Sequence, residues 1–155
     1  MLPSCLAFVL AAGLLLAPAV QAAETPAQHC RRMGTADATR PIAASLVPAA
    51  KRLFGLEAPD AAVRRTTVFR CMDGAVLICT IGANLNCGKA NKGRALLSAK
   101  RYCREHGDAP FIPAFVTGHD TIYRWQCQGG EAVTGEPAEA LDARGFVERL
   151  WKLVE

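Results

Sequence analysis

Six cysteines restrict what this chain can fold into more than any other feature of its sequence. They follow a first cysteine, Cys5, in an N-terminal segment that we expect to be removed on export. The six are Cys30, Cys71, Cys79, Cys87, Cys103 and Cys127. An even number of cysteines in an exported chain indicates disulfides, and a cysteine used as a nucleophile would leave one sulfur unpaired. We therefore expect three disulfides, and the spacing leaves their pairing open.

The gaps between these cysteines argue against a metal centre. They are 41, 8, 8, 16 and 24 residues long, and no pair has the C-x-x-C spacing of zinc sites. The histidines, His29, His106 and His119, also lack a ligand spacing. The sequence thus predicts no metal and no other cofactor.

Residues 1–22 have the form of a secretory signal peptide. The run Leu6–Leu16 is apolar, and Val20–Ala22 supplies small residues for cleavage before Ala23. No Lys or Arg precedes the apolar run, which departs from the usual pattern, and the run is too short for an uncleaved anchor. We expect residues 23–155 to form one disulfide-rich domain in the periplasm or outside the cell, with no transmembrane segment after cleavage.

The dipeptide Asp73-Gly74 predicts a β-hairpin over Thr66–Thr80. It lies between two runs of β-branched and aromatic residues, which is a strong hairpin signal. A two-residue turn here places Cys71 opposite Val76 and directs Cys71 and Cys79 to opposite faces of the ribbon. These two cysteines should not bond to each other.

Apolar periodicity and turn residues predict the remaining elements. The expected helices are Ser45–Gly55, with Gly55 just past the end, Arg94–His106, and a third that starts at Asp142. The expected strands are Phe111–Val116, as an edge strand, and Thr121–Gln128. The segments expected to be irregular are Ala23–Arg40, Glu57–Arg65 and Gly82–Gly93. The sequence predicts an α+β fold: an antiparallel sheet of about four or five strands, with two or three helices, held by disulfides.

Two short segments have the same pattern. Residues 69–74 and 125–130 both read aromatic, polar, cysteine, two further residues, glycine. This similarity favours two related hairpins in one antiparallel sheet, and coincidence is the alternative.

Charge is unevenly distributed along the chain. Residues 31–104 contain 14 basic and 4 acidic residues, a net charge of +10, whereas residues 105–155 contain 4 basic and 9 acidic residues, a net charge of −5. A basic half suits an anionic protein or glycan of the cell envelope, or a lipid headgroup surface. Nucleic acid is not expected, because no basic stretch is interleaved with exposed aromatic residues. The alternative is that the two segments neutralise each other in the fold.

The segment Gly82–Gly93 is the first candidate binding site. It is rich in glycine, asparagine and lysine, which suits hydrogen bonding to a sugar or an anion, and it lacks the phosphate-binding P-loop motif. Its candidate binding residues are Asn84, Asn86, Lys89, Asn91 and Lys92. A connector held by Cys87 is the alternative.

His119 and Asp120 are the second candidate. They place a histidine next to a carboxylate in the turn T-G-H-D. No nucleophile motif accompanies them, so capping of the turn by Asp120 is the more typical role. Catalysis by His119 would require a distant nucleophile such as Ser45 or Ser98.

Two stretches carry a resemblance: F-R-C-M-D-G-A-V-L-I-C-T-I-G-A-N-L-N-C-G-K-A-N-K and F-V-T-G-H-D-T-I-Y-R-W-Q-C. They resemble a group of small exported bacterial proteins with six cysteines, from about Cys30 to the C-terminal segment. The resemblance implies export and relatedness, and it implies no activity. In size, export signal and Y-x-C-like hairpins the chain is also similar to small periplasmic lysozyme inhibitors, although those are nearly all β and have fewer cysteines.

These observations predict an exported, non-catalytic binding protein. It would inhibit a secreted hydrolase or bind an envelope component, with the Asn/Gly/Lys loop and the His119 turn as its contact surface. The alternative function is that of a small secreted hydrolase using His119.

Overall fold

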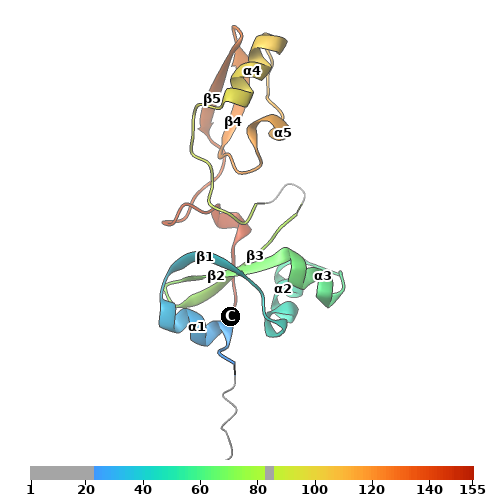
Figure 1. The fold of residues 1–155 in the computed structure, drawn as a ribbon, viewed down its shortest axis with the longest axis vertical. Helices are drawn as coiled ribbons and strands as arrows, with labels where there is room; N and C mark the ends of the chain where they lie inside the picture. Colours follow the sequence, from blue (N-terminus) through green and yellow to red (C-terminus); the bar gives the residue numbers. More distant parts are fainter. Residues whose placement is uncertain (1–22, 83–85) are drawn as a thin grey trace, which may run out of the picture.

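The computed structural model describes residues 23–82 and 86–155. Within them, five α-helices, a four-stranded antiparallel sheet, a two-stranded sheet and three disulfides confirm the predicted α+β class. The elements gather into two units at opposite ends of the long axis, joined by two connecting segments (Figure 1). No helix of the described residues is long and apolar enough to span a membrane. The disulfides are compatible with a periplasmic or extracellular location.

The first unit is built on the four-stranded sheet, in the order β1-β2-β3-β6. Its strands are β1 (Ala36–Pro41), β2 (Thr67–Met72), β3 (Ala75–Thr80) and β6 (Lys152–Leu153). Its helices are α1 (Pro26–Met33), α2 (Val47–Phe54) and α3 (Asp60–Thr66), and the 3-10 turn η1 (Ala44–Leu46) precedes α2. The predicted hairpin is confirmed, with Cys71 opposite Val76. α2 is also confirmed, and it ends at Gly55 in the left-handed conformation.

Apolar clusters cover both faces of this sheet. On one face, Phe69 and Ile78 belong to a cluster that includes residues of α1 and α2. On the other, Cys79 packs with Phe146 and Trp151 from the C-terminal part of the chain. Because both faces are covered, β3 carries apolar residues on both sides, as is typical of a central strand.

The second unit is smaller. It consists of α4 (Leu97–His106), α5 (Ala114–Thr117) and the hairpin of β4 (Tyr123–Gln128) and β5 (Glu131–Pro137). The predicted inward face of β4 is confirmed, because Trp125 and Cys127 are buried against Cys103 of α4. α4 begins three residues later than the sequence predicts, at Leu97.

The prediction of three disulfides is confirmed. The pairs are Cys30–Cys71, Cys79–Cys87 and Cys103–Cys127. The first joins α1 to β2, the third joins α4 to β4, and the second ties the Asn/Gly/Lys loop to the end of β3. Cys71 and Cys79 do not bond to each other, in agreement with their positions on opposite faces of the hairpin.

Two segments expected to be irregular contain regular structure. The expectation that Ala23–Arg40 is irregular is wrong, because α1 and β1 occupy most of this segment. Thr25 starts α1 with a capping box, in which Thr25 Oγ1 accepts from the Gln28 N–H at 3.2 Å and Gln28 Oε1 accepts from the Thr25 N–H at 2.9 Å. The linker expected over Glu57–Arg65 contains most of α3, which begins directly after Pro59.

Two elements expected in the second half are of the wrong type. The edge strand expected over Phe111–Val116 is replaced by α5, because Pro113 occupies the N-cap position of this helix. The helix expected from Asp142 does not form. Asp142 Oδ1 instead accepts the backbone N–H groups of Arg144 and Phe146, which closes a turn containing Gly145 at φ 86°. The turn is followed by the 3-10 segment η2 (Glu148–Leu150) and by β6.

The helices of the two units end in the same way. Both α1 and α4 finish with the pattern C-R-x-x-G, and the glycine N–H donates to the cysteine carbonyl at 2.8 Å in each unit, from Gly34 to Cys30 and from Gly107 to Cys103. The residue after each glycine then contacts the hairpin turn of its own unit. Thr35 Oγ1 accepts the Asp73 N–H at 3.0 Å, and Asp108 Oδ1 accepts the Gly129 N–H at 2.5 Å.

The hairpins of the two units also correspond. Six residues after the helix cysteine, Ala36 pairs with Cys71 and Ala109 pairs with Cys127. Both turns are two residues long with positive φ, at Asp73-Gly74 and Gly129-Gly130. The similarity noted in the sequence is therefore a repeated structural unit, although the expectation of a single sheet is wrong because the two hairpins lie in separate sheets.

A buried ion pair fastens the C-terminal segment to the first sheet. Arg70 of β2 is 1% exposed, and its guanidinium donates to the Asp142 carboxylate. The guanidinium lies over the rings of Phe146 and Trp151, at 4.2 and 4.6 Å from their centroids. These two rings meet edge to face. The segment that returns from the second unit is thus held on β2 by one arginine.

Candidate functional site

The two candidate sites of the sequence lie side by side. The Asn91 N–H donates to the Asp120 carbonyl at 2.7 Å, and the Ile122 N–H donates to the Asn91 carbonyl at 3.2 Å. As a result, Asn86, Lys89, His119 and Asp120 line one small depression. Backbone pairing between distant segments, rather than proximity in sequence, brings these residues together.

The predicted residues differ in how far their side chains are already engaged. Asn86 and Asn91 hold their own loop, since their Oδ1 atoms accept the N–H groups of Gly88 and Gly93 at 2.7 and 2.8 Å. Lys92 and His119 are exposed. Asn84 lies outside the described residues.

Asp120 does not cap its turn as expected. Its carboxylate forms no hydrogen bond within residues 23–82 and 86–155, although its Oδ1 lies close to Gly118, which has a positive φ of 88°. A side chain at position 118 would collide with this carboxylate, since its Cβ would lie 2.6 Å from Oδ1. The T-G-H-D turn therefore requires glycine for both its backbone conformation and its space.

The depression continues into a larger groove, which we name the His119 groove. It has a volume of about 610 Å³ and shares His119, Thr121, Glu139 and Arg149 with the depression. Its other lining side chains include the aromatic residues Phe111, Tyr123 and Trp125 and the polar residues Arg124 and Gln126. The groove thus offers aromatic surface together with hydrogen-bonding groups.

The aromatic residues of the groove are not equally accessible. Trp125 is 3% exposed, and its indole N–H donates to Thr121 Oγ1 at 3.0 Å, so it forms the rigid floor. Tyr123 is covered on one side by the Arg94 guanidinium, 4.3 Å from the ring centroid. Phe111 is 65% exposed and offers the most apolar surface.

Sequence reasoning missed several residues of this groove. Arg124 alternates with the partly buried Tyr123 and the buried Trp125, so the strand pattern already indicated its outward position. Glu139 and Arg149 form an ion pair at 2.5 Å, and the Arg149 hydrogen bond lowers the pKa of the Glu139 carboxyl. Nothing in the sequence indicates that this pair lies beside His119.

The charged segments of the sequence do not neutralise each other broadly. Among the described residues, the one ion pair between a base of residues 31–104 and an acid of residues 105–155 is Arg70–Asp142. Asp37 instead pairs with both Lys89 and Arg144, at 2.7 and 2.8 Å. The basic surface therefore retains cations without acidic partners.

Protonation of Asp37 should weaken its ion pair with Lys89 and so loosen the Asn/Gly/Lys loop. The hydrogen bonds from Arg144 and then from Lys89 hold the pKa of the Asp37 carboxyl well below its usual value of 3.8. A lowered folded-state pKa contributes stability above that usual value and loses it as the pH falls further. We expect the melting temperature of the wild type to fall more steeply below pH 3.8 than that of Asp37→Asn. Glu148→Gln, at an exposed carboxylate without an ion pair in the described structure, is the control, and parallel curves for all three would contradict this prediction.

His119 has no partner of the kind that hydrolysis requires. Its imidazole is exposed, and in the described part of the chain it forms no hydrogen bond to a serine, threonine or carboxylate. Ser45 lies in η1 of the first unit, and Ser98 lies exposed on α4. A hydrolase would place its base within hydrogen-bond reach of its nucleophile.

The His119 groove is thus equipped for recognition. It combines a fixed aromatic floor and exposed cations, and it adjoins a loop in which the Asn86 and Asn91 side chains are held in tight turns. Among the described residues, no group of three or more His, Cys, Asp and Glu side chains could hold a metal ion. Comparison of the chain with protein-family models, curated proteins and solved structures finds no match.

Proposed function

We propose that this protein is an exported, non-catalytic binding protein that recognises an anionic glycan of the cell envelope in the His119 groove. The observation that carries the proposal is the meeting of the Asn/Gly/Lys loop and the T-G-H-D turn, through the hydrogen bonds of Asn91, beside the groove of about 610 Å³. The volume of the His119 groove lies in the range that is typical of ligand pockets.

The chemistry of the lining selects the class of ligand. Arg124 is exposed and forms no ion pair among the described residues, so it is available to a carboxylate. Gln126, Thr121 and His119 offer hydrogen bonds to hydroxyl and amide groups, and Phe111 offers an apolar surface. Sugars that carry carboxylate and acetamido groups present this combination.

The shape favours a glycan over the active site of a secreted hydrolase. An inhibitor would fill the cleft of its enzyme, whereas the His119 groove is a hollow that a ligand enters. The hydrolase alternative has less support, because no nucleophile stands within hydrogen-bond reach of His119 in the described structure.

The proposal can be tested by co-sedimentation with purified peptidoglycan sacculi. The protein is isolated from the periplasm of an expression host and compared with the double variant His119→Ala/Arg124→Ala. We expect the wild type to sediment with sacculi at low salt and the variant to lose about tenfold in affinity, as follows from the loss of one charge-assisted hydrogen bond. High salt should weaken wild-type binding as well.

The matched control is the double variant Arg101→Ala/Arg104→Ala on the exposed side of α4. It removes two positive charges outside the groove. Equal sedimentation of the His119→Ala/Arg124→Ala variant and the wild type, or an equal loss in the control, would refute binding at this site. If the wild type did not sediment with the sacculi, the proposal that the protein binds an envelope glycan would be refuted.

A further inference from the structure

The first unit contains a groove at the place that corresponds to the His119 groove. It has a volume of about 470 Å³ and is lined by Glu24, Pro26, His29, Arg40, Pro41, Ile42, Ala43, Arg64 and Phe69. We name it the Arg40 groove. Both grooves open beside the aromatic residue two positions before the hairpin cysteine, Phe69 in the first unit and Trp125 in the second.

A second feature is similar in the two units, although its positions differ by two residues along the first strand of the hairpin. Each groove is also lined by an isoleucine whose N–H donates to the first strand of its hairpin, from Ile42 to Thr67 at 3.3 Å and from Ile112 to Trp125 at 2.7 Å. In each unit a short helical turn begins two residues after this isoleucine. Each unit therefore has a groove next to this isoleucine and the first strand of its hairpin.

We propose that the Arg40 groove is a second ligand site, and that it binds a small organic carboxylate carrying an aromatic or branched apolar group. The site does not depend on the proposed glycan binding, because it lies in the other unit and has its own lining. It follows that one chain has two sites of common structural origin and different ligand chemistry.

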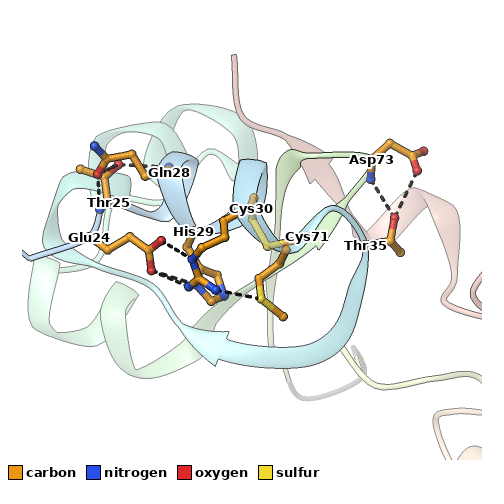
Figure 2. The surroundings of a disulfide bond; sticks show 10 residues. Glu24, Thr25, Gln28, His29, Cys30, Thr35, Cys71 and Asp73 are labelled. Carbon is orange, nitrogen blue, oxygen red and sulfur yellow. Dashed lines mark hydrogen bonds and ion pairs between the residues drawn. A yellow bond between two sulfur atoms is a disulfide. The ribbon is translucent and has the colours of Figure 1, made fainter.

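The floor of the Arg40 groove suits the apolar group. Phe69 and Ile42 are almost completely buried, and Pro41 adds a rigid apolar edge. The disulfide Cys30–Cys71 joins α1 to β2 (Figure 2), and both cysteines belong to the same apolar cluster as Phe69 and Ile42. Because the walls are already in place, little conformational entropy is lost when a ligand enters.

The rim suits the carboxylate. Arg40 and Arg64 are both exposed, line the groove and form no ion pair among the described residues. Arginine binds a carboxylate through two parallel hydrogen bonds, which favours a planar anion over a spherical one.

The one acidic residue of the groove does not oppose an anion. Glu24 accepts two hydrogen bonds from Arg32, at 2.9 and 2.8 Å, and lies 3.3 Å from His29 Nδ1 (Figure 2). The hydrogen bond from Arg32 lowers the pKa of Glu24 to about 2, so its charge is present at neutral pH but paired. His29, held in this way, meets Phe69 edge to face and completes the wall.

The test is an NMR titration of the ¹⁵N-labelled protein with 3-phenylpropionate, and with 3-phenylpropan-1-ol as the neutral probe of the same shape. We expect saturable shifts of the amides around Phe69, Ile42 and His29 with the acid. The alcohol should bind about tenfold more weakly, because it lacks the charge that pairs with arginine. This comparison uses the wild type alone and does not depend on the folding of any variant.

Variants then locate the site. Arg40→Ala/Arg64→Ala should lose about tenfold or more in affinity for the acid, whereas Arg52→Ala/Arg65→Ala, which removes two exposed arginines outside the groove, should bind as the wild type does. His119→Ala/Arg124→Ala should also keep the affinity, which separates this site from the glycan proposal. The inference is overturned by absence of saturable shifts, by equal binding of acid and alcohol, or by full affinity of the Arg40→Ala/Arg64→Ala variant.

Discussion

Replacement of Arg70 by alanine is expected to lower the free energy of unfolding by about 3–5 kcal/mol. The substitution leaves the Asp142 carboxylate buried without its cation, and it removes the guanidinium that lies over the rings of Phe146 and Trp151. The return of the chain to the first sheet depends on these contacts. Urea denaturation followed by tryptophan fluorescence measures the loss directly, since Trp151 is in contact with the substituted side chain.

The ion pair itself is not expected to be the main source of this effect. Arg70 Nε is buried without a hydrogen-bond partner among the described residues, so burial of the guanidinium carries a cost of its own. The double variant Arg70→Met/Asp142→Asn keeps an apolar chain against both rings and removes both charges. We expect it to be markedly more stable than Arg70→Ala. A loss below about 1 kcal/mol for Arg70→Ala would contradict the role assigned to this arginine.

Removal of the Cys30–Cys71 disulfide is expected to have the second large effect. Its residues are 41 positions apart, and the entropy of closing a loop of this length corresponds to about 4 kcal/mol. The Cys79–Cys87 disulfide spans 8 positions, which corresponds to about 2.5 kcal/mol. In urea denaturation, the variant Cys30→Ala/Cys71→Ala should therefore lose more free energy of unfolding than the variant Cys79→Ala/Cys87→Ala.

In glycan binding the order should be reversed: the variant without Cys79–Cys87 should lose more affinity than the variant without Cys30–Cys71. Cys87 lies within the loop that carries Lys89 and Asn91, so loss of Cys79–Cys87 should weaken binding in the His119 groove. Loss of Cys30–Cys71 should instead affect the Arg40 groove, because both cysteines belong to the same apolar cluster as its floor residues Ile42 and Phe69. If the short disulfide proved to be the more stabilising of the two, the chain-entropy explanation would be wrong for this protein.

The parts of the fold that the sequence predicts correctly depend on local interactions. The hairpin at Asp73-Gly74 follows from a turn preference and from the pairing of its immediate neighbours. The end of α2 at Gly55 follows from the left-handed conformation of one residue. Both signals lie within a few residues of the structure they determine.

The incorrect predictions come from segments in which distant contacts decide the structure. Phe146 and Leu150 have the spacing of a helix face, but Phe146 packs on Arg70, which lies 76 positions earlier in the chain. Gly145, inside the first turn of the expected helix, is the local signal that argued against it. For α5, the preference of Pro113 for the start of a helix outweighed the strand-like composition around it.

The candidate site could be predicted in its components but not in its assembly. Residue composition alone indicates the Asn/Gly/Lys loop and the His119 turn as candidates. Their contact depends on the pairing of Asn91 with Thr121, and parallel pairing of single residues leaves no pattern in the sequence. The same holds for Glu139 and Arg149, which come from the connection after β5 and from η2.

The repeated hairpin leaves the protein with two equivalent strand edges, and each is protected from intermolecular pairing in a different way. The outer edge of β3, a strand with apolar residues on both faces, is covered by β6. In the described structure no strand covers the outer edge of β5, but this strand carries Glu131, Glu136 and Pro137, which oppose the addition of another strand. Loss of β6 would therefore leave the outer edge of β3 unpaired, and we expect two copies of the chain to associate through this edge.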